Sequence, residues 1–423
     1  MSWTLCIDLG TSFTTAVIAD EDGCKFVEVD GGRRMPSVVN VDQAGRLHTG
    51  RQAHAMAALD PTGAIRSPKS ALAAGEHAVV RSRDVRTVDL VAAVLRRIAD
   101  EAVRTRSSPP ARLVLTHPAG WDEGGVRRLT AAALAAGLPD PSELYLSEPE
   151  AAACWYMHSA GQDIPLGSAV AIYDLGGGTF DATVLRRNHD GAFDFAGIDG
   201  EPWLGGQNFD KALERVILDN ARHIDAGAYT RVFGSGWADP ADAFAFREDV
   251  IRVKEELSTA QFSDVRVRGF PAAIRVTRGQ FVEAISPDLE RSFDALVRVV
   301  ETSGIAGSRL AHIMLSGGSS QIPVISELMT QVFGRSPQTT SDPKGVVVLG
   351  AAAYGQLKLM EQQLHRPAAP QQVQVQPPAA GGRAGTPWYE KEAAIVGIGV
   401  GAIGVLGAIL GAIDRHRSTV RLY

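Results

Sequence analysis

The sequence predicts an α/β fold in which two similar lobes enclose a cleft and are followed by a linker and an apolar segment. Three observations predict it. Apolar, β-rich runs alternate with helical patterns over about the first 355 residues, as in α/β folds whose sheets are covered on both faces. A glycine-bearing turn after a buried strand occurs twice in nearly the same form. Beyond residue 355 the composition changes abruptly.

The individual elements follow from the periodicity of apolar residues. Buried strands are expected at residues 4–7, 13–19, 112–116 and 170–173, where apolar side chains run together. Helices are expected around residues 91–102 and 281–300, where apolar side chains recur at helical spacing.

Composition narrows the functional classes. The 423 residues are 45% hydrophobic and 21% charged, with a formal net charge of −6, which is ordinary for a soluble protein and argues against a nucleic-acid binder. The chain is too long for one compact core. Cys6, Cys24 and Cys154 are widely spaced and suggest neither zinc nor a disulfide framework, so buried thiols in a reducing compartment are expected. The N-terminus lacks the pattern of a signal peptide, and a cytoplasmic main domain is expected.

The repeated turn is the most specific feature. Residues 7–12 (IDLGTS) and 173–181 (YDLGGGTFD) each carry an apolar strand that ends on Asp, a glycine-bearing turn and a second β-like run. Glycine lets backbone amides approach a phosphate, and the aspartates supply the charge that a hydrated Mg²⁺ needs. Two such hairpins facing each other would clamp one polyphosphate. The alternative is that both are merely tight β-hairpins; no P-loop motif occurs in the chain.

These turns resemble the two phosphate motifs of the actin, sugar-kinase and heat-shock protein 70 superfamily. Further segments are similar to motifs of the chaperone branch in order and spacing, over residues 3–356: 115–121 (LTHPAGW), 146–153 (LSEPEAAA), 204–210 (LGGQNFD) and 315–323 (LSGGSSQIP). The resemblance implies an actin-like ATPase fold, with two ribonuclease-H-like lobes flanking a nucleotide cleft and an insertion near residues 211–300.

The resemblance also implies roles for single residues, with ATP and Mg²⁺ as cofactors. The implied catalytic residues are Lys69, Glu148, Asp174, Thr179 and Asp181. Asp8, Glu148 and Asp174 would hold Mg²⁺, largely through water. The implied nucleotide-binding residues are Asp8, Gly10, Thr11, Ser12, Gly176, Gly177, Gly178, Gly205, Gly206, Lys254, Ser258, Gly317, Gly318 and Ser319.

The role implied for Lys69, and a further role implied for Pro118, have plain alternatives. Lys69 would supply charge near the γ-phosphate, because phosphoryl transfer depends on positioning and charge stabilisation; the alternative is a solvated surface cation. Pro118 falls where the family has its interdomain switch, but a proline that ends a strand needs no special reason.

The sequence departs from the family at the base-binding positions. Glu255 and Gln321 stand where the chaperones have two arginines that sandwich adenine. Their loss removes stacking worth about 1 kcal/mol or more each, so weaker ATP binding or a relaxed base preference is expected.

The domain organisation also departs from the family. An ATPase domain is expected at residues 1–358, a Pro/Gln/Gly-rich linker at 359–392, a transmembrane helix at 393–413 and a basic tail at 414–423. No peptide-binding domain is expected in the 68 residues beyond residue 355, and a standalone foldase is therefore not expected.

The segment 393–413 carries no charged side chain and is long enough to cross a bilayer at about 1.5 Å per residue. It contains two GxxxG spacings, which favour close helix packing in membranes. The alternative is a helix that packs on the ATPase domain or self-associates. Arg415, Arg417 and Arg421 would lie outside if the helix spans, against the positive-inside rule, and a re-entrant or peripheral placement would resolve this.

Together these features predict a membrane-anchored, chaperone-like switch that binds ATP and ADP, hydrolyses ATP slowly and acts on an unknown protein partner or client. The alternative is a membrane-associated actin-like scaffold in which nucleotide binding serves assembly. A small-molecule kinase is a weaker alternative, because no sugar-binding signature is evident.

Overall fold

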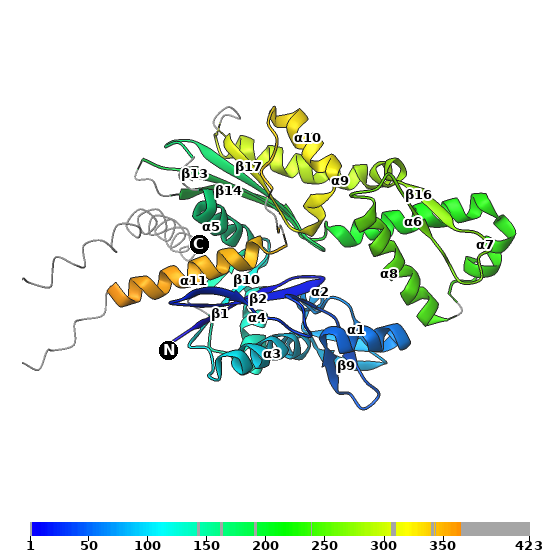
Figure 1. Ribbon diagram of the computed structural model, residues 1–423, viewed down its shortest axis with the longest axis horizontal. Coiled ribbons are helices and arrows are strands. Elements are labelled where there is room, and N and C mark those ends of the chain that lie inside the picture. Colours follow the sequence, from blue (N-terminus) through cyan, green and yellow to red (C-terminus); the bar gives the residue numbers. More distant parts are fainter. Residues whose placement is uncertain are drawn as a thin grey trace, which may run out of the picture.

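The computed structural model describes residues 2–364, except for residues 142–143, 161–163, 190–192, 238, 306–309, 340–341 and 343. Two α/β lobes are stacked on each other, with the amino-terminal lobe coloured blue to cyan and the second lobe green to yellow (Figure 1). The helix that ends the described chain, coloured orange, runs between them.

The first lobe is built on a mixed sheet with the strand order β11-β10-β1-β2-β3, in which β4 also pairs with β2. Its strands are β1 (Thr4–Leu9), β2 (Phe13–Asp20), β3 (Gly23–Phe26), β4 (Arg34–Pro36), β10 (Arg112–His117) and β11 (Tyr145–Ser147). Strand β1 pairs antiparallel with β2 and parallel with β10. The β1–β2 connection is the first predicted glycine-bearing hairpin.

The second lobe repeats this arrangement with the strand order β14-β13-β12-β17. Its strands are β12 (Ala169–Leu175), β13 (Phe180–Arg187), β14 (Phe193–Glu201) and β17 (Leu310–Ser316). Strand β12 pairs antiparallel with β13 and parallel with β17, as β1 does with β2 and β10. The near-repeat in the sequence is therefore a repeat in three dimensions. It places Asp8 opposite Thr15 in one sheet and Asp174 opposite Asp181 in the other.

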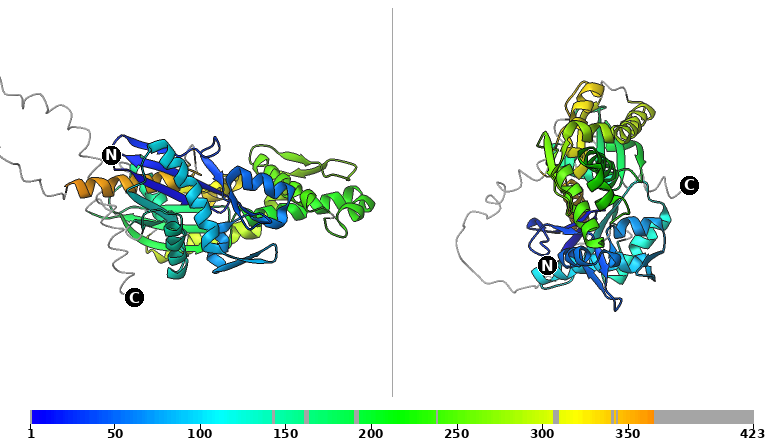
Figure 2. Two further views of the ribbon diagram at one scale, coloured as in Figure 1. Left: turned by 90° about the horizontal axis from the view of Figure 1, so that it is seen from below. Right: turned by 90° about the vertical axis from the view of Figure 1, so that its right-hand side faces the viewer.

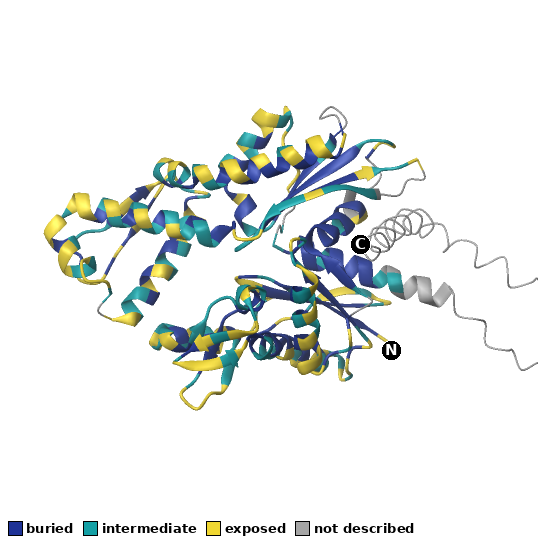
Figure 3. Cartoon of the chain, turned by 180° about the vertical axis from the view of Figure 1, so that it is seen from behind, coloured by how far each residue is buried: buried dark blue, intermediate teal, exposed yellow. Residues whose placement is uncertain are grey.

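Two helices pack against each other between the sheets. Helix α5 (Glu148–Ala160) contacts β12 and β13, and α11 (Val346–Leu364) contacts β1, β2 and β10. A Cβ on Gly350 would lie 1.7 Å from the Ala151 carbonyl oxygen, so only glycine permits this crossing. The two helices share one apolar core with side chains from both sheets, such as Val114 and Ile172. Buried parts of the helices and sheets are dark blue in Figure 3.

Other helices cover the outer face of each sheet. In the first lobe, α3 (Thr87–Arg106) and α4 (Glu123–Ala135) bury side chains such as Leu95 and Leu129 against the sheet. In the second lobe, α6 (Gly206–Ile224) and α9 (Arg278–Thr302) do the same, and α10 (Pro323–Phe333) follows the short helix η3 (Gly318–Gln321). Alternate residues of β1 point to opposite cores, as strand geometry requires.

A smaller subdomain extends from each lobe at the same end of the molecule (Figures 1 and 2). The first contains β5 (Val39–Val41), β6 (Leu47–Thr49), β7 (Ala64–Ile65), β8 (His77–Val80), β9 (Arg83–Arg86), η1 (Pro61–Gly63), α1 (Gly50–Leu59) and α2 (Pro68–Ala74). The second contains the outer part of α6 with α7 (Ala226–Phe233), α8 (Pro240–Glu256), β15 (Phe262–Val265) and β16 (Ile274–Thr277), and it matches the predicted insertion near residues 211–300. The two subdomains flank the cleft.

All predicted strands and both predicted helices are present, each slightly longer than its predicted core. Helix α11 continues to Leu364, past the predicted domain end at 358. Most of the predicted linker, the apolar segment 393–413 and the basic tail 414–423 lie outside the described residues. Within the part of the chain that is described, no helix is long and apolar enough to cross a membrane.

Candidate functional site

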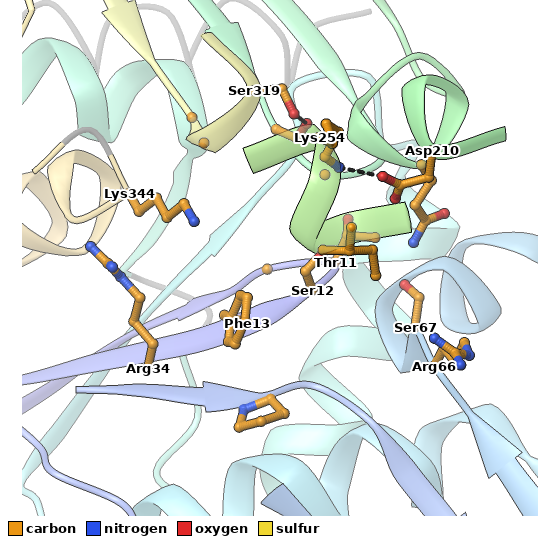
Figure 4. Close-up of a pocket in the computed structure, with 18 of the residues that line it drawn as sticks. Thr11, Ser12, Phe13, Arg34, Arg66, Ser67, Asp210, Lys254, Ser319 and Lys344 are labelled. Carbon is orange, nitrogen blue, oxygen red and sulfur yellow. Dashed lines mark hydrogen bonds and ion pairs between the residues drawn. The ribbon is translucent and has the colours of Figure 1, made fainter. Parts of the chain in front are cut away.

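A cavity of about 1070 Å³ lies between the lobes and is lined from both of them (Figure 4). Of the predicted site residues, most line it: Asp8, Gly10, Thr11, Ser12, Lys69, Glu148, Asp174, Gly176, Gly177, Thr179, Lys254, Ser258, Gly317, Gly318 and Ser319. The other four predicted residues, Gly178, Asp181, Gly205 and Gly206, are not part of this lining but are neighbours of residues that are. The chain thus gathers in one place residues that are spread over most of its described length.

The two glycine-bearing hairpins face each other at the floor of the cavity. A Cβ on Gly177 would lie 2.7 Å from Ser12 Oγ, and a Cβ on Gly178 would lie 2.9 Å from Thr11 Cγ2. Any side chain at these two glycines would therefore fill the space between the hairpins. Backbone amides and hydroxyls remain there, and groups of this kind bind phosphate oxygens in other proteins.

The second hairpin is held from behind by the start of helix α6. Gly206 N donates to Gly176 O at 3.0 Å, and a Cβ on Gly205 would lie 2.5 Å from Gly178 N. Ser319 Oγ, from η3, also donates to Gly176 O at 2.9 Å. Gly205 and Gly206 therefore fix the hairpin and do not themselves line the cavity.

Helix starts position the lysine and the glutamate. Ser67 Oγ accepts from Ser70 N at 3.1 Å and caps α2, which places Lys69 in its first turn. The Ser147 and Glu150 side chains cap α5 reciprocally, which places Glu148 in its first turn. Lys69 forms an ion pair with Glu148, and the two residues are only 4% and 8% exposed. The alternative that Lys69 is a solvated surface cation is therefore wrong.

Buried carboxyl groups outnumber cations around Lys69. Burial and the charge of Glu148 raise the pKa of Asp8 to about 7, against the opposing effects of Lys69 and a 3.1 Å hydrogen bond from Thr116 Oγ1. Burial and Glu148 likewise raise the pKa of Asp181 to about 7, and they raise that of Asp174 well above its ordinary value.

Lys69 itself stays protonated. Burial acts to lower its pKa, but the nearby carboxylates of Glu148 and Asp8 outweigh burial and raise it.

This excess of buried negative charge fits a divalent cation. Within the described residues no group of three or more His, Cys, Asp or Glu side chains is close enough to hold a metal ion directly. Direct coordination by the predicted set of Asp8, Glu148 and Asp174 is thus absent from the described structure, and coordination through water stays a prediction. Burial and the charge of Glu148 raise the pKa values of Asp8 and Asp174, and a bound Mg²⁺ would supply positive charge that favours their ionised forms.

The other end of the cavity lies between helix α8 and the turn after β17. Gly317 has φ +81°, and a Cβ there would lie 2.4 Å from the Leu175 carbonyl oxygen, so this turn requires glycine. Lys254 pairs with Asp210 at 2.6 Å and donates to Gly206 O at 3.3 Å (Figure 4). Lys254 thereby ties α8 to α6.

Several cavity residues were missed by the sequence analysis. His54 Nε2 lies 3.1 Å from Glu248 Oε2, and Arg66 Nη1 lies 3.2 Å from Glu248 Oε1, across the mouth of the cleft. The Arg66 guanidinium also lies 4.5 Å from the ring centroid of Phe244. We name His54, Arg66, Phe244 and Glu248 the mouth contact. Residues so far apart in sequence carry no local pattern that could have predicted it.

A second bridge between the lobes joins Arg34 of β4 to Asp342. Beside it, Lys344 Nζ lies 3.4 Å from Glu255 Oε1 on α8. Glu255 therefore has a partner of opposite charge in place of the stacking role expected of an arginine at this position. Gln321, the other departure from the family, is exposed and does not line the cavity.

Comparison with known proteins agrees with this geometry. The sequence matches the Hsp70 protein family over residues 4–365. The chain belongs to the Hsp70 family. Its Hsp70 relatives include the chaperone protein HscA of Cronobacter sakazakii and that of Enterobacter sp., each 31% identical over 372 residues. A chaperone protein HscA homolog of Aeromonas hydrophila is 31% identical over 370 residues.

Each of these alignments covers 82% of this chain but 56% of the relative. The chain thus spans little more than half the length of the curated relatives it matches. The expected resemblance to the heat-shock protein 70 chaperones and the expected α/β architecture are confirmed.

Proposed function

We propose that this protein binds Mg²⁺–ATP in the cleft, hydrolyses it slowly and uses the resulting change in lobe closure as a switch. The observation that carries the proposal is the meeting of the two glycine-bearing hairpins around the buried Lys69–Glu148 pair. Membership of the Hsp70 family, whose members are ATPases, supports it.

Different residues of the cleft bind the phosphates, stabilise the charge of the transition state and hold Mg²⁺. Backbone amides of the two hairpins and the hydroxyls of Thr11, Ser12 and Thr179 bind phosphate oxygens. Lys69, which stays protonated, stabilises the charge that develops on the γ-phosphate. When bound, Mg²⁺ would neutralise β- and γ-phosphate oxygens, held through water by Asp8, Glu148 and Asp174.

The attacking water needs a hydrogen-bond acceptor beside Thr179. Asp181 lies opposite Asp174 in the β12–β13 register and is 5% exposed, so it can take this role together with the Thr179 hydroxyl. The Asp181 carboxyl also accepts a backbone hydrogen bond from Ala119, next to Pro118. This contact links the hydrolytic end of one lobe to the strand-end loop of the other and supports the predicted switch role of Pro118.

Single-turnover hydrolysis of Mg²⁺–ATP tests the enzymatic proposal. Thr179→Ala should slow the chemical step about a hundredfold, because it removes a hydroxyl that orients the water and donates to phosphate. Thr302→Ala, an exposed threonine on α9, is the matched control and should hydrolyse at the wild-type rate. Equal rates for wild type and Thr179→Ala would rule out hydrolysis in this cleft.

A protein partner or client recognises whether the cleft is in its ATP-bound or ADP-bound state. The relatives are named chaperones, which supports a protein client for this chain. They also extend well beyond the part that this chain matches, so client binding is proposed for this chain and not carried over from them. Pull-down of one partner by the ATP-bound form and its release in the ADP-bound form would support the switch; capture that ignores the nucleotide would contradict it.

We further propose that the apolar segment 393–413 attaches this cytoplasmic ATPase to a membrane. Flotation of the full chain with liposomes, and loss of flotation in a chain ending at residue 392, is the expected result. Equal flotation of the two chains would overturn it.

The scaffold alternative is favoured by one observation, the charged pair of Glu255 and Lys344 where the family stacks adenine. It predicts nucleotide-dependent assembly. A full chain that sediments as the same species with and without ATP would exclude it.

A further inference from the structure

If the hairpins bind the phosphates of a nucleotide, as proposed above, its base lies farther along the same cavity. The cavity is also lined by α8 and by the Gly317–Gly318 turn, which packs against the end of β12. On α8 the cavity-lining residues Ile251, Lys254 and Glu255 fall on one helix face. We call this end, lined by Ile251, Glu255, Ser258, Gly317, Gly318, Ile322 and Lys344, the base subsite.

The charged groups of the base subsite are a carboxylate and an ammonium, and Ser258 adds a hydroxyl. Lys344 is held in place, because its stem lies against Gly318, where a Cβ would be 2.8 Å from Lys344 Cε. Its Nζ lies 5.9 Å from the Phe13 ring centroid, and the two side chains lie close together in Figure 4. The Glu255 side chain is 61% exposed and that of Lys344 31% exposed. The Glu255 carboxylate is therefore able to turn toward a base at little cost, since an exposed ion pair contributes little to stability.

The hydrogen-bonding pattern of this pair can be compared with that of the purine bases. A carboxylate only accepts hydrogen bonds and an ammonium only donates them. Guanine carries two adjacent donors, N1–H and the 2-amino group, beside the acceptors O6 and N7. Both donors can reach one carboxylate, as in other bidentate charge-assisted pairs, and the ammonium can donate to O6.

Adenine fits the same pair less well. It offers its 6-amino group as the only donor on that edge, and the neighbouring N1 is an acceptor that would face the second carboxylate oxygen. Glu255 and Gln321 stand at the two positions where the family has arginines that stack on adenine, so neither of these positions offsets the mismatch by guanidinium stacking. A site that hydrogen-bonds one base discriminates against the base that leaves its polar groups unpaired.

We propose that the base subsite accepts guanine nucleotides, with Glu255 as the residue that sets the preference between guanine and adenine. The inference rests on the proposed function, because it assumes that the phosphates occupy the hairpins. It goes beyond that function by adding guanine nucleotides to the adenine nucleotides that the same cleft takes.

Calorimetric titration of the full chain with ADP, GDP and inosine diphosphate, each with Mg²⁺, tests the proposal without hydrolysis. GDP should bind at least as tightly as ADP. Inosine diphosphate lacks the 2-amino group and should bind about tenfold more weakly than GDP, because a hydrogen bond to a charged group is lost.

The variant Glu255→Gln replaces one acceptor by a donor at nearly constant size. It should weaken GDP binding about tenfold or more and change ADP binding far less. Glu256→Gln is the matched control: it makes the same charge change one residue away, where the side chain contacts Arg252 and Ser263 outside the cavity. The control should change neither affinity.

The outcomes separate the two proposals. ADP binding with GDP about a hundredfold weaker, or an unchanged GDP-to-ADP ratio in Glu255→Gln, overturns the guanine inference and leaves the proposed function standing. Absence of binding by all three nucleotides overturns both.

Discussion

Replacing Lys69 by methionine should test the charge balance of the cleft. Methionine keeps the length of the side chain and removes its charge. In the wild type Lys69 is 4% exposed, and its ammonium pairs with Glu148 and offsets the buried carboxyls of Asp8, Asp174 and Asp181. Breaking a buried pair and leaving its partner charged costs about 3–5 kcal/mol of stability.

The cost should depend on pH. At pH 9 Asp8 and Asp181, whose pKa values are about 7, are charged, and the full penalty of about 3 kcal/mol is expected in the free energy of unfolding. At pH 5 Asp8 and Asp181, whose pKa values are about 7, carry protons in the folded state, so the penalty should shrink. Urea unfolding of nucleotide-free protein at both pH values measures this difference.

The same substitution should slow hydrolysis. Loss of one preorganised charge beside the γ-phosphate is expected to reduce the single-turnover rate about 100- to 1,000-fold. Lys25→Met is the control for both assays, because Lys25 lies exposed on β3 away from the cleft. If Lys69→Met lost no more stability and no more activity than Lys25→Met, the reasoning about the buried charge cluster would be refuted.

Three further predictions rest on the same geometry. Glu248→Ala should speed nucleotide release about tenfold in stopped-flow measurements, because it removes the shared partner of His54 and Arg66 at the mouth contact. An unchanged release rate would show that the mouth contact does not retain nucleotide. The free energy of unfolding of nucleotide-free protein should fall as pH rises from about 4 to about 7. Over this range Asp8 and Asp181 keep their protons in the folded state, whereas in the unfolded chain, where their pKa is 3.8, they have lost them. A free energy of unfolding that rises over this range in urea titrations would contradict the raised pKa values. Gly317→Ala should destabilise the fold by about 1–3 kcal/mol, measured by urea unfolding, because its φ is +81° and a Cβ would meet the Leu175 carbonyl; a loss no larger than that of Gly120→Ala, where a Cβ meets nothing, would refute it.

The sequence predicted the fold because its strongest signals are local. A buried strand ending on Asp, followed by a glycine-bearing turn, determines a β-hairpin wherever it occurs, and it occurs at Asp8 and at Asp174. The turn also determines the register that sets Asp181 opposite Asp174. The helix starts at Ser67 and Ser147, which carry Lys69 and Glu148, were not predicted, although a serine at such a position is a common local signal of a helix start.

Contacts between distant segments carried no such signal. The mouth contact joins His54 to Glu248, and the base subsite joins Glu255 to Lys344, and each pair depends on how the two lobes meet. The sequence showed only that Glu255 stands where an arginine was expected. The sequence did not show that Lys344 is the partner of Glu255, because this contact depends on where the fold places residue 344.

The central claim is that the cleft binds a Mg²⁺–nucleotide through its hairpins and buried carboxylates. Calorimetric titration of the full chain with ATP and with GTP in the presence of Mg²⁺, beside the variant Asp174→Asn, tests it most directly. We predict dissociation constants of about micromolar order for the wild type and a loss of at least about tenfold in the variant. No binding of either nucleotide, or equal affinity in Asp174→Asn, would contradict the claim.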